Sequence, residues 1–332
     1  MEKKKIVDTI KLENGECIEK KFKSYLEMAK YAVDWTLFCH YKLRVNCVDG
    51  LFKILKLTNM QVSYTKEVGG IMYNYASPKE SINISILINV EDKASLQEMK
   101  VQTDMVIITQ SEKIYNFITN RGVEIIDISC SKDDNSLLYN RLKPYVDKFF
   151  YDYDKKIQTE LLTIFETYTE ERLDIPTVQT IEKKITDAII NSIDIQKVNI
   201  PSFTKSESIA LTIREQLFNH MDSTVSVETL ATQYKISEKS LQTAFKSLYG
   251  FTPSIFIRLM KLNLVYHELL QSSPSTEITI LRVAQKWGFK HMGRFSGYYK
   301  ELFLELPSDT LQRDYQLSNG MSVYCVERKD EI

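Results

Sequence analysis

Two groups of side chains in the last third of the chain have the residue types that recognise nucleic acids. Glutamine can hydrogen-bond adenine through two atoms, threonine can touch the thymine methyl group, and lysine or arginine can pair with guanine or with a phosphate. The alternative for every member is an ordinary solvated helix face. The first group is Lys239, Gln242, Thr243 and Lys246, and the second is Lys290, His291, Met292, Arg294 and Ser296.

The sequence contains no comparable group of residues that would indicate an enzyme. The sequence has no glycine-rich phosphate loop, no His-Glu-x-x-His and no Gly-x-Ser-x-Gly elbow. Cys39 and His40 are adjacent, but neighbours in a strand point to opposite faces and would not share a site. We therefore expect no catalytic residues, no cofactor and no metal.

The two groups lie in two copies of one unit, separated by 53 to 54 residues. Ala231 matches Ala284 at an offset of 53, and a single insertion in the turn of the second copy brings the other pairs to 54. Those pairs are Leu241 with Phe295, Phe245 with Tyr299, Lys246 with Lys300, Pro253 with Pro307, and Ser254 with Ser308.

Each copy predicts two short helices joined by a tight turn. In the first copy Ser237 can cap the second helix and Gly250 can end it. In the second copy the turn is Trp287-Gly288-Phe289, whose glycine tolerates positive φ.

Pro253 can open a connecting helix of roughly 18 residues, about 27 Å long. That length is comparable to the ~34 Å between successive major grooves on one face of DNA. A preceding helix is predicted from Ile209, Ala210, Ile213, Leu217, Phe218 and Met221.

These residues resemble the double helix-turn-helix domain of AraC/XylS-type transcription regulators, over Thr204 to Arg313. The matching positions are Leu230-Ala231, Ser237, Leu241, Phe245-Lys246, Gly250, Thr252-Pro253, Leu262, Leu269-Leu270, Ala284, Gly288-Phe289, Phe295, Tyr299-Lys300 and Pro307. The resemblance implies sequence-specific binding to double-stranded DNA. It implies base contacts by Lys239, Gln242 and Thr243, and a phosphate contact or a local salt bridge for Lys246.

Several positions depart from the family pattern. Leu304 replaces a glycine, Thr243 replaces a frequent arginine, and Gly293 and Gly297 put bare backbone on the second recognition helix. Those glycines either permit close approach to DNA or indicate that this helix contributes little specificity. Arg294 is the strongest candidate contact there. The absent glycine and the Trp-Gly-Phe turn are similar to the ethanolamine-utilisation regulator subgroup.

The first 130 residues predict strands. Residues 82–90 place four isoleucines and Val90 at alternate positions, separated by Asn83, Ser85, Leu87 and Asn89, which indicates one buried and one mostly polar face. Residues 105–109, 114–118 and 123–129 follow, with a hairpin expected at 120–122. Two amphipathic helices, 157–168 and 178–189, then carry apolar stripes that form either a dimer seam or a face packed on the sheet.

The expected fold class is therefore α+β. It consists of a strand-rich, cupin-like N-terminal sensor and dimerisation domain with flanking helices (1–200), an all-α domain of two helix-turn-helix units joined by a long linker helix (204–315), and a tail (316–332). The cupin-like fold and sensor role are implied by the family resemblance. Trp35, Phe38, Tyr64, Tyr73 and Tyr75 either line an effector pocket or are plain core.

We expect an activator that responds to a small-molecule effector, forms a homodimer and works with RNA polymerase. The alternative is a regulator whose N-terminal domain binds a protein partner and no small ligand.

Charge, cysteine content and apolar segments indicate how the protein binds DNA and in which compartment it is found. The formal net charge is −1, and residues 204–315 carry 13 basic and 11 acidic residues, so DNA affinity should depend on clustered contacts and be sensitive to salt. Five dispersed cysteines support neither a disulfide scaffold nor a zinc module. The N-terminus shows no secretion signal, and the apolar stretches are shorter than the ~20 residues of a membrane span. We expect a cytoplasmic protein that does not associate with membranes.

Overall fold

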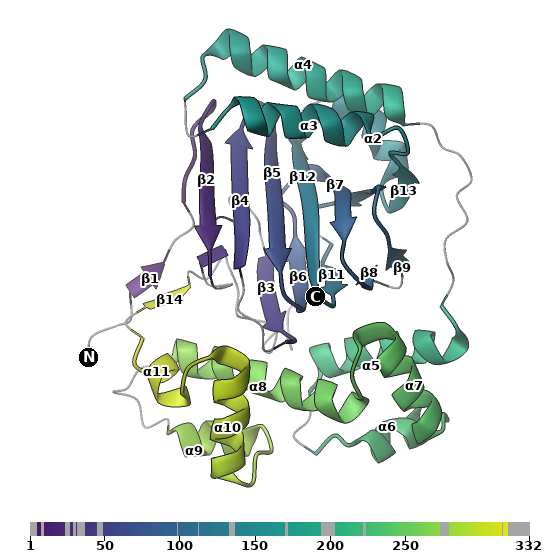
Figure 1. The fold of residues 1–332 in the computed structure, drawn as a ribbon, viewed down its shortest axis with the longest axis vertical. Coiled ribbons are helices and arrows are strands. Elements are labelled where there is room, and N and C mark those ends of the chain that lie inside the picture. Colours follow the sequence, from purple (N-terminus) through teal and green to yellow (C-terminus); the bar gives the residue numbers. More distant parts are fainter. Residues whose placement is uncertain are drawn as a thin grey trace.

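The alternating apolar residues of the N-terminal region build two antiparallel sheets that face each other (Figure 1). This computed structural model describes residues 5–7, 10–23, 27–28, 31, 37–44, 49–97, 99–111, 113–132, 137–169, 172–193, 203–221, 224–272, 279–313 and 315–317. The larger sheet has the order β13 (Lys148–Tyr151), β10 (Met105–Gln110), β7 (Ser81–Val90), β12 (Gly122–Ser131), β5 (Met60–Val68), β4 (Asp49–Lys56), β2 (Cys17–Phe22). The smaller sheet has the order β3 (Leu37–Lys42), β6 (Ile71–Ala76), β11 (Tyr115–Thr119), β8 (Ala94–Leu96), β9 (Met99–Val101).

The expected hairpin at 120–122 is wrong, because the chain changes sheets there. β11 pairs with β6 and β8, whereas β12 pairs with β5 and β7. A Cβ on Gly122 would lie 2.6 Å from the backbone oxygen of Glu67, so only glycine fits where the chain crosses over. The two strands therefore belong to opposite layers.

The prediction of one buried and one polar face in β7 is also incomplete, because both faces are buried as far as Leu87. Ile82, Ile84 and Ile86 belong to one apolar cluster, and Leu87 belongs to another. The buried polar residues Asn83 and Ser85 alternate with the isoleucines and share the face of Leu87, toward the interior between the sheets.

Two helices cover the outer face of the larger sheet. They are α3 (Lys156–Thr167) and α4 (Ile175–Ser192), which follow the short α2 (Leu137–Leu142), η1 (Lys143–Tyr145) and β13 (Figure 1). Ile157, Leu161, Ile181 and Ile185 are at most 2% exposed and share one cluster with the strands. The apolar stripes are therefore packed on the chain's own sheet, which leaves them unavailable as a dimer seam.

The described part of the C-terminal region contains seven helices. They are α5 (Lys205–Asn219), α6 (Val227–Gln233), α7 (Glu238–Tyr249), α8 (Pro253–Gln271), α9 (Ile280–Lys286), α10 (Met292–Phe303) and α11 (Pro307–Leu311), and β14 (Tyr315–Leu317) then pairs in parallel with β1 (Lys5–Val7). The predicted ends of α7 and the start of α8 are confirmed. Among the described residues, no helix combines the length and the apolar character that crossing a bilayer requires. The α+β fold class is confirmed.

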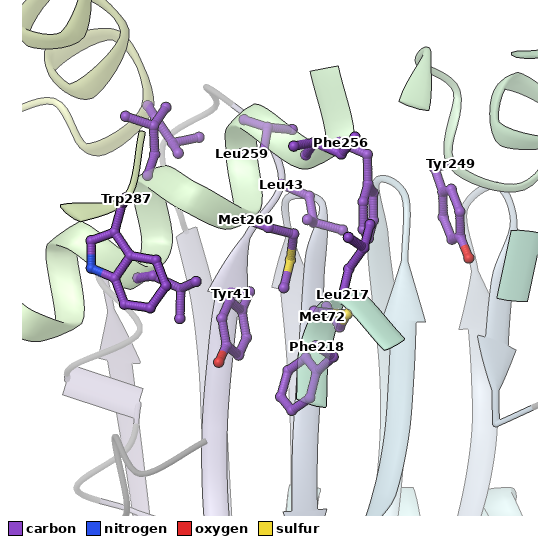
Figure 2. Close-up of a cluster of buried hydrophobic side chains, with 14 of the residues drawn as sticks. Tyr41, Leu43, Met72, Leu217, Phe218, Tyr249, Phe256, Leu259, Met260 and Trp287 are labelled. Carbon is purple, nitrogen blue, oxygen red and sulfur yellow. The ribbon is translucent and has the colours of Figure 1, made fainter. Parts of the chain in front are cut away.

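Sheet and helices share an apolar cluster. Tyr41, Leu43 and Met72 of the smaller-sheet region pack with Phe218 and Met260 of the helices, as Figure 2 shows. The rings of Tyr41 and Phe218 meet edge to face, with centroids 4.9 Å apart. The strand-rich and helical regions are therefore in direct apolar contact.

Candidate nucleic-acid interface

Helix α7 presents the first predicted group of side chains. The Ser237 hydroxyl accepts a hydrogen bond from the amide of Ser240 at 3.1 Å, and Gly250 ends the helix with a left-handed φ of 77°. Leu241, Ala244, Phe245 and Leu248 are buried. The opposite face exposes all four predicted residues to solvent, namely Lys239, Gln242, Thr243 and Lys246.

The threonine of this face is already bonded to its own helix. The hydroxyl of Thr243 donates to the backbone oxygen of Lys239 at 2.9 Å. Since that hydroxyl is used within the helix, the γ-methyl group is the part of Thr243 that remains for an external contact. The methyl group is the part suited to thymine.

Helix α6 crosses α7 through a small residue and a tight turn. Ala231 is 6% exposed, and its carbonyl accepts from the amide of Ile236 at 3.0 Å. Lys235 in the turn takes a φ of 52°. α5 packs against α7, as its apolar pattern predicts. This arrangement fixes the orientation of the exposed face of α7.

Helices α9 and α10 repeat this arrangement. Thr279 caps α9 by accepting from the amide of Arg282, and Gly288 takes the predicted positive φ of 85°. Lys290, His291 and Arg294 are exposed, as a DNA contact requires. Met292 and Ser296 are half-buried, and Met292 packs against the apolar cluster.

Three of the departures from the family pattern lie on the surface of the second helix pair. A Cβ built on Gly293 or Gly297 would meet nothing within 4 Å, so both glycines border open space. Leu304 ends α10 in the left-handed conformation, with a φ of 62°, although it is not glycine. Its side chain is 55% exposed, so the strained backbone does not disturb the core.

Helix α8 connects the two helix pairs and holds the second pair in place. Glu268 accepts from Trp287 Nε1 at 2.8 Å and from Lys286 Nζ at 2.9 Å. The guanidinium of Arg258 lies 4.2 Å from the ring centre of Tyr298 on α10. Sequence reasoning missed both residues, and the available signal was that each charge interrupts the apolar run of α8.

The sheets contact the last turn of α7 through polar groups. Asn120 donates from its side chain to the backbone oxygen of Leu248 at 3.0 Å, and Lys93 donates to that of Ser247. Ser247 in turn donates to Glu207 at 2.7 Å, which lies 3.6 Å from Lys100. Burial would raise the pKa of Glu207, but the bonds from Thr204 and Ser247 outweigh it, so the pKa is lowered. The carboxylate form thus links α5, α7 and β9.

A cavity of about 70 Å³ lies between the two sheets. Of the predicted aromatic residues, Tyr73 and Tyr75 line it, whereas Tyr64 belongs to the cluster on the opposite face of the larger sheet. Trp35 lies outside the described residues, as does the side chain of Phe38. Sequence reasoning missed two acidic lining residues, Glu67 and Asp127. Their signal was a carboxylate that continues the alternate polar positions of a strand, with Thr65 two residues before Glu67 and Ser129 two residues after Asp127.

Comparison with known proteins agrees with this geometry. A family described as "Helix-turn-helix domain" matches residues 230–313. "XylDLEGF operon transcriptional activator 2" of Pseudomonas putida is 46% identical over 88 residues, which are 26% of this chain and 55% of the relative. "XylDLEGF operon transcriptional activator 1" of P. putida is 30% identical over 252 residues, 72% of this chain and 67% of the relative. The chain thus spans about half the length of the first relative and two thirds of the second.

Solved structures include a similar chain, described as the AraC-like transcriptional activator CuxR. It is 11% identical, with a TM-score of 0.40, over 69% of this chain and 88% of that one. The family assignment depends on the sequence relatives, which extend beyond the helical region into the strand-rich one. This chain belongs to the AraC/XylS family of transcription regulators.

Proposed function

We propose that this chain is a sequence-specific transcription activator that reads DNA through two helix-turn-helix units, α6–α7 and α9–α10. Residues 204–315 form the DNA-binding domain, residues 1–200 a cupin-like sensor domain, and residues 316–332 a tail. The observation that carries the proposal is the uniformly exposed polar face of α7 opposite its buried apolar face.

In the first unit, α7 lies in a major groove. Gln242 hydrogen-bonds a base edge, the Thr243 methyl group contacts a thymine, and Lys239 reaches a neighbouring base. Lys246, near the end of the helix, neutralises a phosphate. Phosphate contacts fix register, whereas base contacts supply the sequence preference.

In the second unit, Arg294 is the principal contact, with Lys290 and His291 beside it. Met292 and Ser296 are half-buried, so they contact DNA only with their exposed parts. The open space around Gly293 and Gly297 permits the backbone of α10 to approach DNA closely. α8 has 19 residues and is about 28 Å long at 1.5 Å per residue, which suits two successive major grooves on one DNA face.

The N-terminal domain supplies control. We infer that it binds a small effector, pairs two copies of the chain, and acts with RNA polymerase in the cytoplasm. The alternative is an N-terminal domain that binds a protein partner and no small ligand. The acid-lined cavity favours a small effector, because a protein surface would not reach between the sheets. A dimer would use a surface other than the stripes of α3 and α4, which are buried. Membership in a family of transcription regulators agrees with the expectation that the chain is not an enzyme.

The test selects binding sites from random duplex DNA with the full chain and then measures affinities by fluorescence anisotropy. Gln242→Ala should change the preferred base at one position, by about 1–3 kcal/mol. Lys246→Ala should weaken all sequences alike and reduce the slope of log K against log salt by about 0.9. Lys205→Ala, an exposed lysine on α5, is the control and should leave base preference unchanged.

Two results would contradict this placement of α7. One is a change in sequence preference with Lys246→Ala but not with Gln242→Ala. The other is a folded chain that selects no sequence at low salt. Light scattering at micromolar concentration, with and without the selected DNA, tests the dimer separately.

A further inference from the structure

We propose that the cavity between the two sheets binds a small organic cation, namely an ammonium group attached to a short apolar chain. This inference deepens the effector part of the proposed function and rests on it. Its support is a set of inward-facing acidic and aromatic side chains that no basic residue accompanies among the residues described around the cavity.

Two carboxyl groups from neighbouring strands of the larger sheet face this space. Glu67 of β5 is 2% exposed, and its Oε1 has no hydrogen-bond partner among the described residues. Its Oε2 accepts from the hydroxyl of Tyr73. Asp127 of β12 accepts at Oδ1 from Ser85 and, at 3.2 Å, from the side-chain amide of Asn83. One buried carboxylate oxygen is therefore available to a donor inside the cavity.

Within the described part of the chain, the lining provides no cation for these acids. Its titratable residues are Glu67, Asp127, Tyr73 and Tyr75, and the other lining residues are Met28, Thr65, Ser85, Leu87, Leu96, Ile107, Phe117, Val123 and Ile125. A buried carboxylate is costly unless it is paired. A ligand that carries a positive charge supplies that partner, whereas an anion would be repelled.

The remaining walls suit the rest of such a molecule. The rings of Tyr73 and Phe117 are stacked with centroids 6.4 Å apart, and the faces of aromatic rings attract cations. Leu87, Leu96 and Ile107 provide an apolar surface. Since a water needs ~10–15 Å³, a cavity of about 70 Å³ holds on the order of five water-sized groups. The ligand is therefore small, at about five to seven non-hydrogen atoms.

Cation binding must displace a proton from the cavity. Burial raises the pKa of Glu67 to about 8, although the Tyr73 hydroxyl opposes this, and burial raises that of Asp127 to about 6. Near pH 7 Glu67 is mainly protonated, so an ammonium ion binds as the carboxyl proton leaves to solvent. Apparent affinity should therefore weaken about tenfold for each pH unit below 8 and level off above it.

Calorimetric titration of the full chain tests this with three matched probes, which are n-butylammonium, 1-butanol and butyrate. We expect n-butylammonium to bind at least tenfold more tightly than either of the others, with proton release at pH 7. Glu67→Gln should lower its affinity at least tenfold at pH 8 and remove the pH dependence. Glu124→Gln is the control, because Glu124 bonds Tyr64 outside the cavity, and it should bind as the unmodified chain does.

Equal or tighter binding of butanol or butyrate, or no binding of any probe, overturns the cation site. An unchanged affinity in Glu67→Gln, with folding confirmed by circular dichroism, overturns it as well. DNA binding of the same preparations is measured separately without probe. Failure there would remove the proposed function, whereas a chain that binds DNA but no ammonium would remove only this inference.

Discussion

The contact of Asn263 with strand β3 gives the sharpest stability prediction. Asn263 lies in α8 and is 2% exposed. Its Oδ1 accepts from the backbone amide of Lys42 at 2.8 Å, and its Nδ2 donates to the backbone oxygen of Lys42 at 2.9 Å. Nδ2 also donates to the backbone oxygen of Leu259 at 2.8 Å. β3 is the last strand of its sheet on this side among the described strands, so one side chain pairs an exposed strand edge with a helix.

Asn263→Leu keeps the number and branching of the side-chain heavy atoms and removes all three hydrogen bonds. A hydrogen bond contributes ~0.5–1.5 kcal/mol net, and a buried polar group that loses its partner costs ~1–3 kcal/mol. Because both polar groups of the Lys42 backbone lose this buried partner, we expect the free energy of unfolding to fall by about 3 kcal/mol.

Guanidinium unfolding, followed by far-ultraviolet circular dichroism and by tryptophan fluorescence, measures this difference. Gln271→Leu is the matched control, since Gln271 is exposed at the end of the same helix, and it should change stability by less than about 0.5 kcal/mol. A change of that small size in Asn263→Leu would refute the view that this residue holds the sheet on the helices.

Three further predictions follow from burial and backbone conformation. Ile181→Asp combined with Ile185→Asp should unfold the strand-rich region by circular dichroism, because both side chains are core; light scattering that showed folded monomers instead would restore the seam. Leu304→Gly should raise the free energy of unfolding by denaturant by about 1 kcal/mol, because glycine tolerates the left-handed backbone at this position. Gly250→Ala should lower it, because Gly250 has a φ of 77° and a Cβ there would lie 2.7 Å from Arg44. If both substitutions changed the free energy of unfolding in the same direction, this reasoning would be wrong. The raised pKa of Glu67 means that the folded state holds the proton of this carboxyl group more tightly than the unfolded state does. The stability contributed by the protonated group is therefore lost as pH rises from about 4.5 to about 8. Glu67→Gln should flatten the dependence of melting temperature on pH across that window.

Local rules predict the helical region well because each signal acts within one or two turns. Ser237 caps α7 through an amide three residues away, and Gly250 ends the helix because it tolerates positive φ. Pro253 opens α8 as predicted. The repeated apolar spacing then determines which face of α7 is buried, and hence that Gln242 and Lys246 are exposed.

The same local rules fail where the layer that a strand joins is decided far away in the sequence. A break such as residues 120–122 is compatible with a hairpin or with a crossing between sheets. Only the partners of β11 and β12 distinguish the two outcomes. Alternation likewise shows that β7 has a polar face, but not that a second sheet covers that face.

The sequence alone determined the family, the α+β fold class, the helix ends and the exposed face of α7, since these depend on residues close together or on a repeat. Tertiary structure alone decided that the stripes of α3 and α4 lie on the sheet, that Asn263 pairs with β3, and that Glu67 and Asp127 face one cavity. Glu67 and Asp127 are 60 residues apart, and their proximity depends on the register between β5 and β12, which pairs Asp127 with Ser63. No hairpin turn joins β5 and β12, so their register is set by which faces are buried and not by a local turn.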